Sequence, residues 1–337
     1  METINTKIGI FILNYNGVNW LKQTLPNLIK YSSETEIIII DNNSSDNSTK
    51  YLKTQFPSIE LRINKQNYGF AKGYNQILLE ESRFKYFIIM NNDVKVSRNW
   101  IQPLLKKIKN NDIGIVQPKI KSLKKPNYFD YAGAAGGYID LLGIPFCRGR
   151  ILNKIESDTG QYDDDTNIFW ASGACFMIKA KLFKELNGFD EIFFMHQEEI
   201  DLCWRSKNLN QKSYYVGEST VYHFGGGTLE YNSPKKIYYN HRNNLLLLIK
   251  NLDSRFIFII LFRILLDYML IIAYILSGIF YLKNALSILK AHGSFLLLLP
   301  KILKSRKPIK SELIYKGSVI FDYYIRRKKT FSTLKQF

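Results

Sequence analysis

The sequence contains few cysteines and few histidines. Its 337 residues include four histidines and three cysteines, Cys147, Cys175 and Cys203. An odd number of cysteines without paired or metal-type spacing argues against a disulfide framework and against a zinc site, so we expect a reducing compartment. The first apolar run, Ile8–Leu13, is followed by no cleavage-site pattern, so no secretory signal is expected. Low-complexity tracts and internal repeats are also lacking, and 46% hydrophobic residues predict a globular chain.

Acidic residues are outnumbered by basic ones. The chain has 47 Lys and Arg against 29 Asp and Glu, a net charge of +18, which would ordinarily suggest nucleic-acid binding. However, residues 301–337 hold 11 basic and 2 acidic side chains, so half of the excess lies in this segment. Its charges alternate with Ile, Leu, Tyr and Phe, a pattern that suits an anionic lipid surface. We therefore expect a membrane-surface partner and no nucleic acid.

Short apolar runs alternate with helix-like segments in the first half of the chain. The runs that predict strands are Ile8–Leu13, Glu36–Ile40, Ile59–Ile63, Tyr86–Met90 and Ile113–Gln117. This alternation predicts an α/β fold with a mostly parallel central sheet flanked by helices. Polar loops beginning at Asn14, Asp41 and Asn91 follow the strongest runs, and ligands of such sheets bind beyond the carboxyl ends of the strands. We expect these loops to line one crevice.

The pattern weakens between Lys119 and Thr166, where glycine, proline and charged residues are frequent. We expect loops here that shape an acceptor pocket. Helices are predicted near Lys181–Leu186 and from Glu198 to about Ser206. The pattern of this first unit ends near Thr228.

The last hundred residues are predicted to be helical. A helix at Asn243–Lys250 is followed by Phe256–Leu282, 27 nearly continuous apolar residues interrupted by Arg263 and Asp267. Charges within a membrane span are costly, although these two fall four residues apart and could partly neutralise each other. A hydrophobic hairpin or interfacial helices are favoured, and a true span stays open.

Three polar segments could bind a nucleotide and a metal. Asp41 and Asp46 could accept hydrogen bonds from a base or ribose, or could cap the following helix. Asn67 and Gly69 lie in a loop that allows close backbone approach to a ligand, or that simply turns into a helix. Asp93 follows an apolar strand and could supply an oxygen ligand to Mg²⁺ or Mn²⁺, or belong to a common turn.

Two further segments could take part in acid–base or metal chemistry. Glu198, Glu199 and Asp201 crowd one helix start, where the helix dipole favours negative charge. Alternatively, one of them deprotonates an acceptor hydroxyl. His223 directly precedes Gly225–Gly227; such a histidine is more often structural, but the glycines suit close ligand approach.

Taken in order, these motifs resemble the inverting family-2 glycosyltransferases with the GT-A nucleotide-diphospho-sugar transferase fold, most closely the bacterial rhamnosyltransferases. The resemblance extends from about Lys7 to Thr228. The segments that carry it are Tyr15-Asn16, Asp41–Asp46, Asn67–Ala71, Asn91–Val94, Trp170–Ala174, Gly188–Asp190, Glu198–Arg205 and His223.

The resemblance implies roles for individual residues. Glu199 would be the general base, and Asp93 with His223 would hold Mg²⁺ or Mn²⁺ on the donor diphosphate. The implied donor-binding residues are Asn16, Asp41, Asn67, Gly69 and Asn92, with Asp41 at the base, and the implied acceptor-binding residues are Trp170, Ser172 and Glu198. In the family, Asp usually stands where this chain has Asn91, which implies weaker metal binding. The base is most often Asp, so Glu199 reaches one methylene further.

The resemblance also implies a dTDP- or UDP-linked sugar donor, dTDP-rhamnose being favoured, and a polyprenyl-diphosphate-linked glycan acceptor in cell-wall polysaccharide biosynthesis. We expect a catalytic domain at residues 1–240 and a helical, basic, hydrophobic region at residues 241–337. The latter would make the protein peripheral at the cytoplasmic, inner face of the cell membrane. Two alternatives stay open: a catalytically silent nucleotide-sugar binding module, and a transferase that uses UDP-hexose or UDP-galactofuranose.

Overall fold

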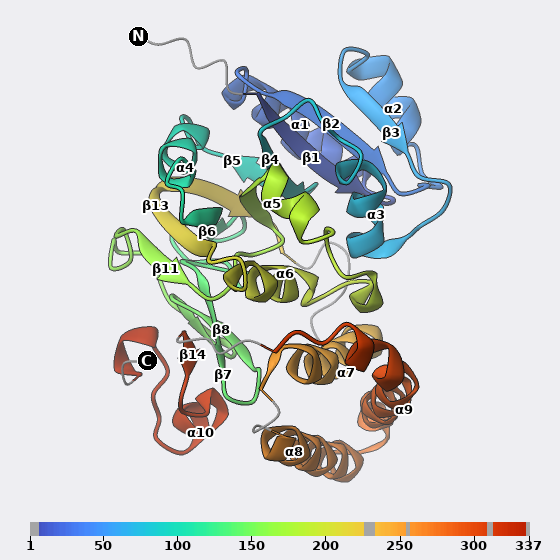
Figure 1. The fold of residues 1–337 in the computed structure, drawn as a ribbon, viewed down its shortest axis with the longest axis vertical. Coiled ribbons are helices and arrows are strands. Elements are labelled where there is room, and N and C mark those ends of the chain that lie inside the picture. The colour runs from blue at the N-terminus through green and yellow to red at the C-terminus, as the bar shows by residue number, and fades with distance from the viewer. Residues whose placement is uncertain (1–6, 226–232, 254–256, 309–312, 335–337) are drawn as a thin grey trace.

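The computed structural model describes residues 7–225, 233–253, 257–308 and 313–334 (Figure 1). Within them, a nine-stranded sheet runs in the order β11-β13-β6-β12-β4-β1-β2-β3, with β5 paired to β13. Its strands are β1 (Ile8–Asn14), β2 (Glu36–Asp41), β3 (Glu60–Ile63), β4 (Tyr86–Asn91), β5 (Val94–Val96), β6 (Ile113–Ser122), β11 (Thr166–Ile168), β12 (Cys175–Lys179) and β13 (Lys212–His223). All five predicted strands are therefore confirmed.

The register of the sheet aligns the ends of three strands. Strand β1 is parallel to β2, with Asn14 opposite Asp41, and parallel to β4, with Leu13 opposite Asn91. The predicted parallel arrangement holds for β1–β4, whereas β12 enters antiparallel between β4 and β6. The polar residues after these strands consequently meet at one edge of the sheet.

Helices cover both faces of this sheet. They are α1 (Val18–Tyr31), α2 (Ser48–Gln55), α3 (Gly69–Leu78), α4 (Ile101–Ile108), α5 (Ala180–Glu185) and α6 (Glu198–Lys207), together with the 3₁₀ turn η1 (Glu191–Phe193). Side chains alternate along β1, so Ile10 and Ile12 belong to the core under α1 and α4, whereas Phe11 belongs to the core under α3, α5 and α6. A helix-flanked α/β sheet follows, as predicted.

The expectation of loops between Lys119 and Thr166 is wrong where this segment forms strands, mainly within residues 137–155. It forms most of a second sheet, whose strands are β7 (Gly137–Asp140), β8 (Pro145–Cys147), β9 (Arg150–Ile151), β10 (Lys154–Ile155) and β14 (Ile314–Tyr315) from near the C-terminus. Gly143 and Gly149 have φ of 71° and 90° and turn the chain between β7, β8 and β9. Strands this short, joined by glycine turns, leave too little periodicity in the sequence to be predicted.

The C-terminal region forms three packed helices and a short end segment. The helices are α7 (Pro234–Asn251), α8 (Ile257–Leu276) and α9 (Leu282–Lys304), with η3 (Ile279–Tyr281) before α9 and with α10 (Val319–Tyr324) and η4 (Phe331–Thr333) after it. Figure 1 shows α7 between the main sheet unit and the hairpin of α8 and α9. The predicted boundary at residue 240 lies inside α7, and Thr228 and Phe256 lie outside the described residues.

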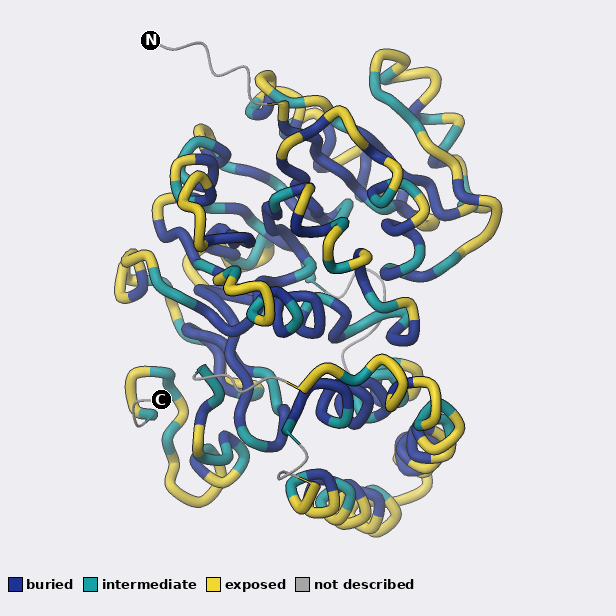
Figure 2. Tube along the Cα trace, viewed as in Figure 1, coloured by how far each residue is buried: buried dark blue, intermediate teal, exposed yellow. Residues whose placement is uncertain are grey.

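The charged residues of α8 point inward. Asp267 lies 2.7 Å from Nδ1 of His241 on α7 and 2.9 Å from Nε2 of His292 on α9, and it also pairs with Arg263. The outer side of the hairpin is apolar instead, and Phe258, Leu276 and Phe280 are 76%, 81% and 91% exposed (Figure 2). By length and composition, two helical stretches here, Ile257–Leu276 and Ile279–Lys304, could each cross a membrane.

Candidate functional site

A hydrogen-bond network joins the polar ends of β1 and β2 to the loop after β4. Nδ2 of Asn14 donates to Oδ2 of Asp41 (3.0 Å), and Nδ2 of Asn92 donates to Oδ1 of Asn14 (2.8 Å). The fully buried Asp41 also accepts from the N–H and hydroxyl of Ser44 at 2.8 and 2.7 Å. A carboxylate has about four acceptor positions, so three bonds leave Asp41 with capacity for one more.

Asn16 and Asn67 order the neighbouring loops. Oδ1 of the exposed Asn16 accepts from the N–H of Ser45 at 2.8 Å, and Oδ1 of Asn67 accepts from the N–H of Gly69 at 2.9 Å. Gly69 has φ of 74°, and a Cβ there would lie 2.7 Å from the carbonyl oxygen of Phe194. Only glycine fits this close contact between the start of α3 and the segment before α6.

Strand pairing brings Asp93 and His223 together. In the ladder between β5 and β13, His223 stands opposite Val94, the residue after Asp93. Nε2 of His223 lies 3.1 Å from Oδ1 of Asp93, and both side chains are buried. On the other side of the ring, Nδ1 lies 2.9 Å from Oδ1 of Asp130. Sequence reasoning missed Asp130, which follows β6 and is 93 residues from its partner.

The two carboxylates dominate the electrostatics of this histidine. Burial opposes the charged ring, but the carboxylates of Asp93 and Asp130 raise the pKa of His223 to about 10. Burial would raise the pKa of Asp93, yet the His223 ring and nearby backbone N–H groups hold that pKa below its ordinary range. Without a metal, both ring nitrogens of His223 therefore carry protons and face the carboxylates of Asp93 and Asp130. A metal bound at Nε2 would displace the proton that this nitrogen shares with Asp93.

Asp93 and His223 fit two ligand positions of a divalent cation. Adjacent ligands of an octahedral Mg²⁺, each about 2.1 Å from the metal, are about 3.0 Å apart. In the structure, where the two side chains contact each other directly, their separation is 3.1 Å. No cluster of three or more His, Cys, Asp or Glu side chains suited to a metal occurs in the described ranges. Water and the phosphates of a substrate could supply further ligands. Asn91 contributes no charge here, and its Nδ2 lies 3.5 Å from Nε2 of His223.

The buried Glu198 and the partly buried Glu199 form an acidic pair at the start of α6. Oε2 of each has no hydrogen-bond partner among the described residues. Burial raises the pKa of Glu199 to about 7, although backbone N–H groups, including that of Gly173, favour its charged form. Burial and the neighbouring Glu199 hold the pKa of Glu198 well above its ordinary range. Such a pair can hold and release a proton near neutral pH.

The third acidic residue of this segment has a structural role. Asp201 is fully buried and lies 2.6 Å from Nε of Arg205 and 2.9 Å from Nζ of Lys250. Nδ2 of Asn251 also donates to it at 3.0 Å. These contacts tie α6 to α7, and they leave Glu198 and Glu199 as the candidates for chemistry.

Trp170 and Ser172 belong to the segment that leads to Gly173, which lies against Glu199. Their exposed fractions are 5% and 2%. Nε1 of Trp170 donates to the carbonyl of Tyr138 at 2.9 Å, and the hydroxyl of Ser172 donates to the carbonyl of Ala132 at 2.8 Å. Their polar atoms thus support the strand and loop around them, and their contact with an acceptor stays a prediction.

A chain of contacts at the end of β4 links the acidic pair to the Asp93–His223 pair. Glu199 lies against Gly173, and the carbonyl of the next residue, Ala174, accepts from the N–H of Asn91 at 3.0 Å. Asn91 in turn neighbours His223. The sheet therefore brings together the predicted base, the predicted metal ligands and the Asn14–Asp41 network.

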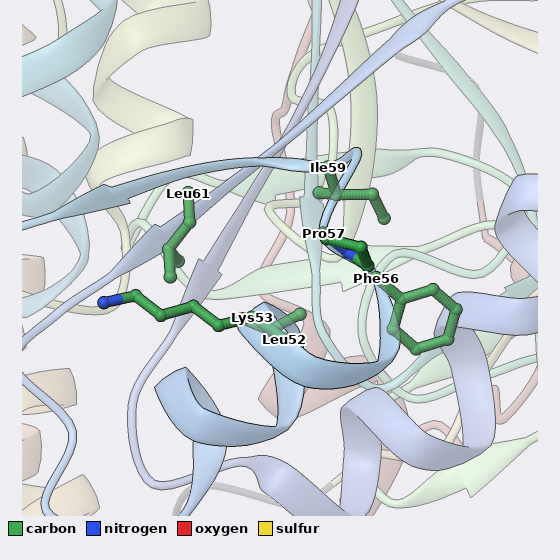
Figure 3. A pocket seen from close by; sticks show the side chains of 6 residues that line it. All are labelled: Leu52, Lys53, Phe56, Pro57, Ile59 and Leu61. Carbon is green, nitrogen blue, oxygen red and sulfur yellow. The ribbon is translucent and has the colours of Figure 1, made fainter.

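A surface hollow elsewhere contains none of these residues. It has a volume of about 220 Å³ and lies between α2 and the edge strand β3 (Figure 3). Its lining residues are Leu52, Lys53, Phe56, Pro57, Ile59 and Leu61.

Comparison with known proteins agrees with this arrangement. The sequence model of the family named glycosyl transferase family 2 matches residues 9–187 of this chain. The low-salt glycan biosynthesis hexosyltransferase of Haloferax volcanii is 22% identical over 73% of this chain and 76% of its own length. The N-acetylglucosaminyl-diphospho-decaprenol L-rhamnosyltransferase of Mycobacterium tuberculosis is 23% identical over 56% of this chain and 66% of its own length.

A solved structure supports the fold. GalNAc-T7, determined with UDP, GalNAc and Mn²⁺, superposes with a TM-score of 0.58 at 18% identity. The match covers 73% of this chain and 48% of GalNAc-T7, so the chain spans about half the length of that protein. The predicted GT-A fold is confirmed. On its sheet, its motifs and the family match, the chain belongs to glycosyl transferase family 2, and its relatives include rhamnosyltransferases.

Proposed function

We propose that this glycosyltransferase moves a sugar, rhamnose being favoured, from a nucleotide-diphosphate donor to a lipid-linked glycan with inversion at the anomeric carbon. The observation that supports this best is that the partly buried carboxylate of Glu199 and the Asp93–His223 pair both adjoin the end of β4. Inverting transfer needs a base on the acceptor side and charge neutralisation on the leaving-group side. In this proposal the Glu198–Glu199 pair supplies the base, and the Asp93–His223 pair holds the cation that neutralises charge on the leaving group.

In the proposed reaction, Glu199 accepts the proton of an acceptor hydroxyl as that oxygen attacks the anomeric carbon. The bond from this carbon to the donor phosphate breaks, and the nucleoside diphosphate leaves. Burial raises the pKa of Glu199 to about 7, which matches a base that operates near neutral pH. The pKa of Glu198 is also raised by burial and by Glu199, and in its protonated form Glu198 would donate a hydrogen bond to the acceptor. Bound by Asp93 and His223, a Mg²⁺ or Mn²⁺ ion would neutralise charge on the diphosphate.

We propose that the nucleotide lies along the strand ends. The remaining acceptor capacity of Asp41 would bind the base, with Asn16, Asn92, Asn67 and Gly69 shaping the loops around the donor. The M. tuberculosis relative is named as a rhamnosyltransferase, which favours dTDP-rhamnose. A UDP-linked hexose or galactofuranose is the second candidate, and GalNAc-T7 was solved with UDP.

We propose that the acceptor is a polyprenyl-diphosphate-linked glycan presented at the inner face of the cell membrane, as a step of cell-wall polysaccharide synthesis. The name of the M. tuberculosis relative contains such a lipid. The exposed apolar side of α8 and α9 would contact the lipid, with the basic residues after α9 near anionic headgroups. In this proposal residues 1–240 carry the catalysis and residues 241–337 the membrane contact, with α7 shared between them.

A transfer assay tests the proposal. The purified full chain, with Mn²⁺ and a polyprenyl diphosphate bearing N-acetylglucosamine, is incubated with dTDP-rhamnose or with UDP-linked sugars. We expect one donor to give a glycosylated lipid of inverted configuration. Glu199→Gln should abolish product but keep nucleotide binding. A wild-type chain that binds the nucleotide sugar yet transfers nothing to lipid or water would instead indicate a silent binding module.

A further inference from the structure

The segment that leads into the acidic pair has an unfavourable backbone. Phe194, His196 and Gln197 have φ values of 61°, 69° and 71°, in the left-handed region that non-glycine residues rarely adopt. Such conformations cost on the order of 1–3 kcal/mol each, and they persist only where the surroundings enforce them. Gln197 directly precedes Glu198, so this turn sets the direction in which α6 begins.

Two side chains from α7 hold this turn. Nδ2 of Asn243 lies within hydrogen-bond distance of the carbonyls of Phe193 (3.0 Å), Met195 (2.8 Å) and His196 (2.7 Å). A guanidinium nitrogen of Arg242 donates to the carbonyls of Ile192 (3.1 Å) and Phe193 (2.9 Å). From the opposite side, the N–H of Phe70 at the start of α3 donates to the carbonyl of Phe194 at 2.8 Å. The turn is therefore fixed by elements on both sides.

The orientation of the Asn243 amide is itself determined. Its side chain is fully buried, and Nε of Arg242 donates to its Oδ1 at 2.8 Å. A guanidinium can only donate and a carbonyl can only accept, so exchanging the amide oxygen and nitrogen would break every one of these bonds. Arg242 thus directs the NH₂ group of Asn243 toward the turn.

We propose that Asn243 is a positioning residue for the base Glu199, acting through the turn at residues 193–197. This inference rests on the proposed function. A base must lie within hydrogen-bond reach of the hydroxyl it deprotonates, and a displacement of about 1 Å far from the reacting atoms can lower the rate about 100-fold. Without the amide, the carbonyls of Met195 and His196 lose their bonds from α7, and the strained turn relaxes together with the first residues of α6.

Asn244 supplies a matched control on the same helix. It is also buried, and its Nδ2 donates at 2.7 Å to the carbonyl of Gly143, in the turn between β7 and β8. Asn243→Ala and Asn244→Ala each remove one buried amide from α7. They differ in which segment loses its hydrogen bonds.

The test compares the two variants in the full chain by steady-state transfer across pH. For Asn243→Ala we expect kcat to fall ten- to a hundredfold, whereas KM for the nucleotide sugar should stay within twofold. The acid limb of kcat, meaning the pH at which kcat rises to half of its plateau value, should move away from pH 7. Asn244→Ala should keep both kcat and the acid limb within twofold. Arg242→Lys retains the positive charge but loses the planar set of guanidinium donors. It should change kcat and its acid limb in the same direction as Asn243→Ala does. If Asn243→Ala does not fold, Arg242→Lys takes its place in the test.

The outcomes separate this inference from the proposed function. A wild-type chain without transfer would contradict the proposed function and this inference with it. Active wild-type enzyme with an unchanged kcat and acid limb in Asn243→Ala, or in Arg242→Lys where the alanine variant does not fold, would overturn the positioning role alone. Equal losses in the Asn243 and Asn244 variants would also overturn it, because they would indicate a general effect of loosening α7.

Discussion

Oδ1 of Asp130 lies 2.9 Å from Nδ1 of His223, across the imidazole from the nitrogen that faces Asp93. Metal-binding histidines commonly donate their second ring N–H to a carboxylate, which fixes the tautomer and the orientation of the ring. Asp130 makes this contact from the loop after β6. It is thus a partner of the ligand histidine in the proposed metal site.

Removing the Asp130 carboxylate should weaken metal binding. We expect Asp130→Ala to lower the affinity for Mn²⁺ about ten- to a hundredfold, measured as free Mn²⁺ by electron paramagnetic resonance with a nucleoside diphosphate present. Asp130→Asn should lose less, because an amide oxygen still accepts from Nδ1–H. The control is Asp158→Ala, since Asp158 pairs with Lys121 at 2.8 Å. Unchanged Mn²⁺ affinity in Asp130→Ala would rule out the orienting role.

The rate of transfer should rise with pH through about 7. Glu199 must be ionised to accept a proton, and burial raises its pKa to about 7. We therefore expect log kcat to increase with unit slope below pH 7 and to level off above it. The measurement is a pH profile at saturating donor and acceptor. A profile that is flat from pH 5 to pH 8 would contradict Glu199 as the base.

The Glu199 carboxyl should lower the stability of the fold over the same pH range in which it raises the rate of transfer. A carboxyl whose folded pKa is raised from 4.5 to about 7 binds its proton more tightly in the folded state. Its contribution to the free energy of unfolding therefore falls as pH rises from 4.5 to 7. Glu199→Gln, which is neutral throughout, should melt at a higher temperature than the wild type at pH 8. If calorimetry gives a lower melting temperature there, Glu199 is not destabilised by burial.

Breaking the contact between α6 and α7 should destabilise the fold. Asp201→Ala leaves the buried Lys250 with one carboxylate fewer, and we expect a loss of roughly 3–5 kcal/mol in the free energy of unfolding. Glu185→Ala removes an exposed pair with Lys181 and should cost under about 1 kcal/mol. Urea unfolding followed by fluorescence measures both. Similar losses in the two variants would show that the buried contact carries no special weight.

Polar residues on the outer side of the hairpin should reduce membrane binding. Replacing Phe258, Phe262 and Phe280 with Ser removes exposed rings, and we expect about tenfold weaker partitioning per residue, since burying one such side chain contributes about 1.5 kcal/mol or more. Co-sedimentation with anionic lipid vesicles measures it.

The melting temperature should stay unchanged, because these rings are exposed. The control replaces Ile63 and Leu209, two exposed apolar residues of the main sheet unit, and should sediment like the wild type. Sedimentation of the Phe258, Phe262 and Phe280 variant at the wild-type level would exclude the hairpin as the membrane contact.

The sequence predicted that the polar residues at the ends of the long apolar strands lie together. Asp41 and Asn91 are the last residues of the apolar strands β2 and β4, and the register of the parallel sheet brings the ends of these strands together. Glu199 and His223 were named by their place in an ordered set of motifs. Each of these predictions depends on one local segment.

Residues that act through distant partners were not predictable in this way. Asp130 meets His223 across 93 positions, and no spacing in the sequence links them. Asn243 lies 47 positions from His196, on a helix that the sequence placed only at Asn243–Lys250. Both pairings depend on the packing of side chains between elements, which periodicity does not encode.

A protein shortened within α7 would lose residues that support the segment around Glu199 and that have no part in lipid contact. A chain ending at residue 240 would lack Arg242, Asn243 and Lys250, all of which contact the segment around Glu199. Such a fragment should be inactive even with a water-soluble acceptor, for reasons unrelated to membranes. A soluble and active form is better obtained by keeping the whole chain and replacing exposed apolar residues on the outer side of α8 with polar ones. Such a protein could be crystallised and assayed without detergent.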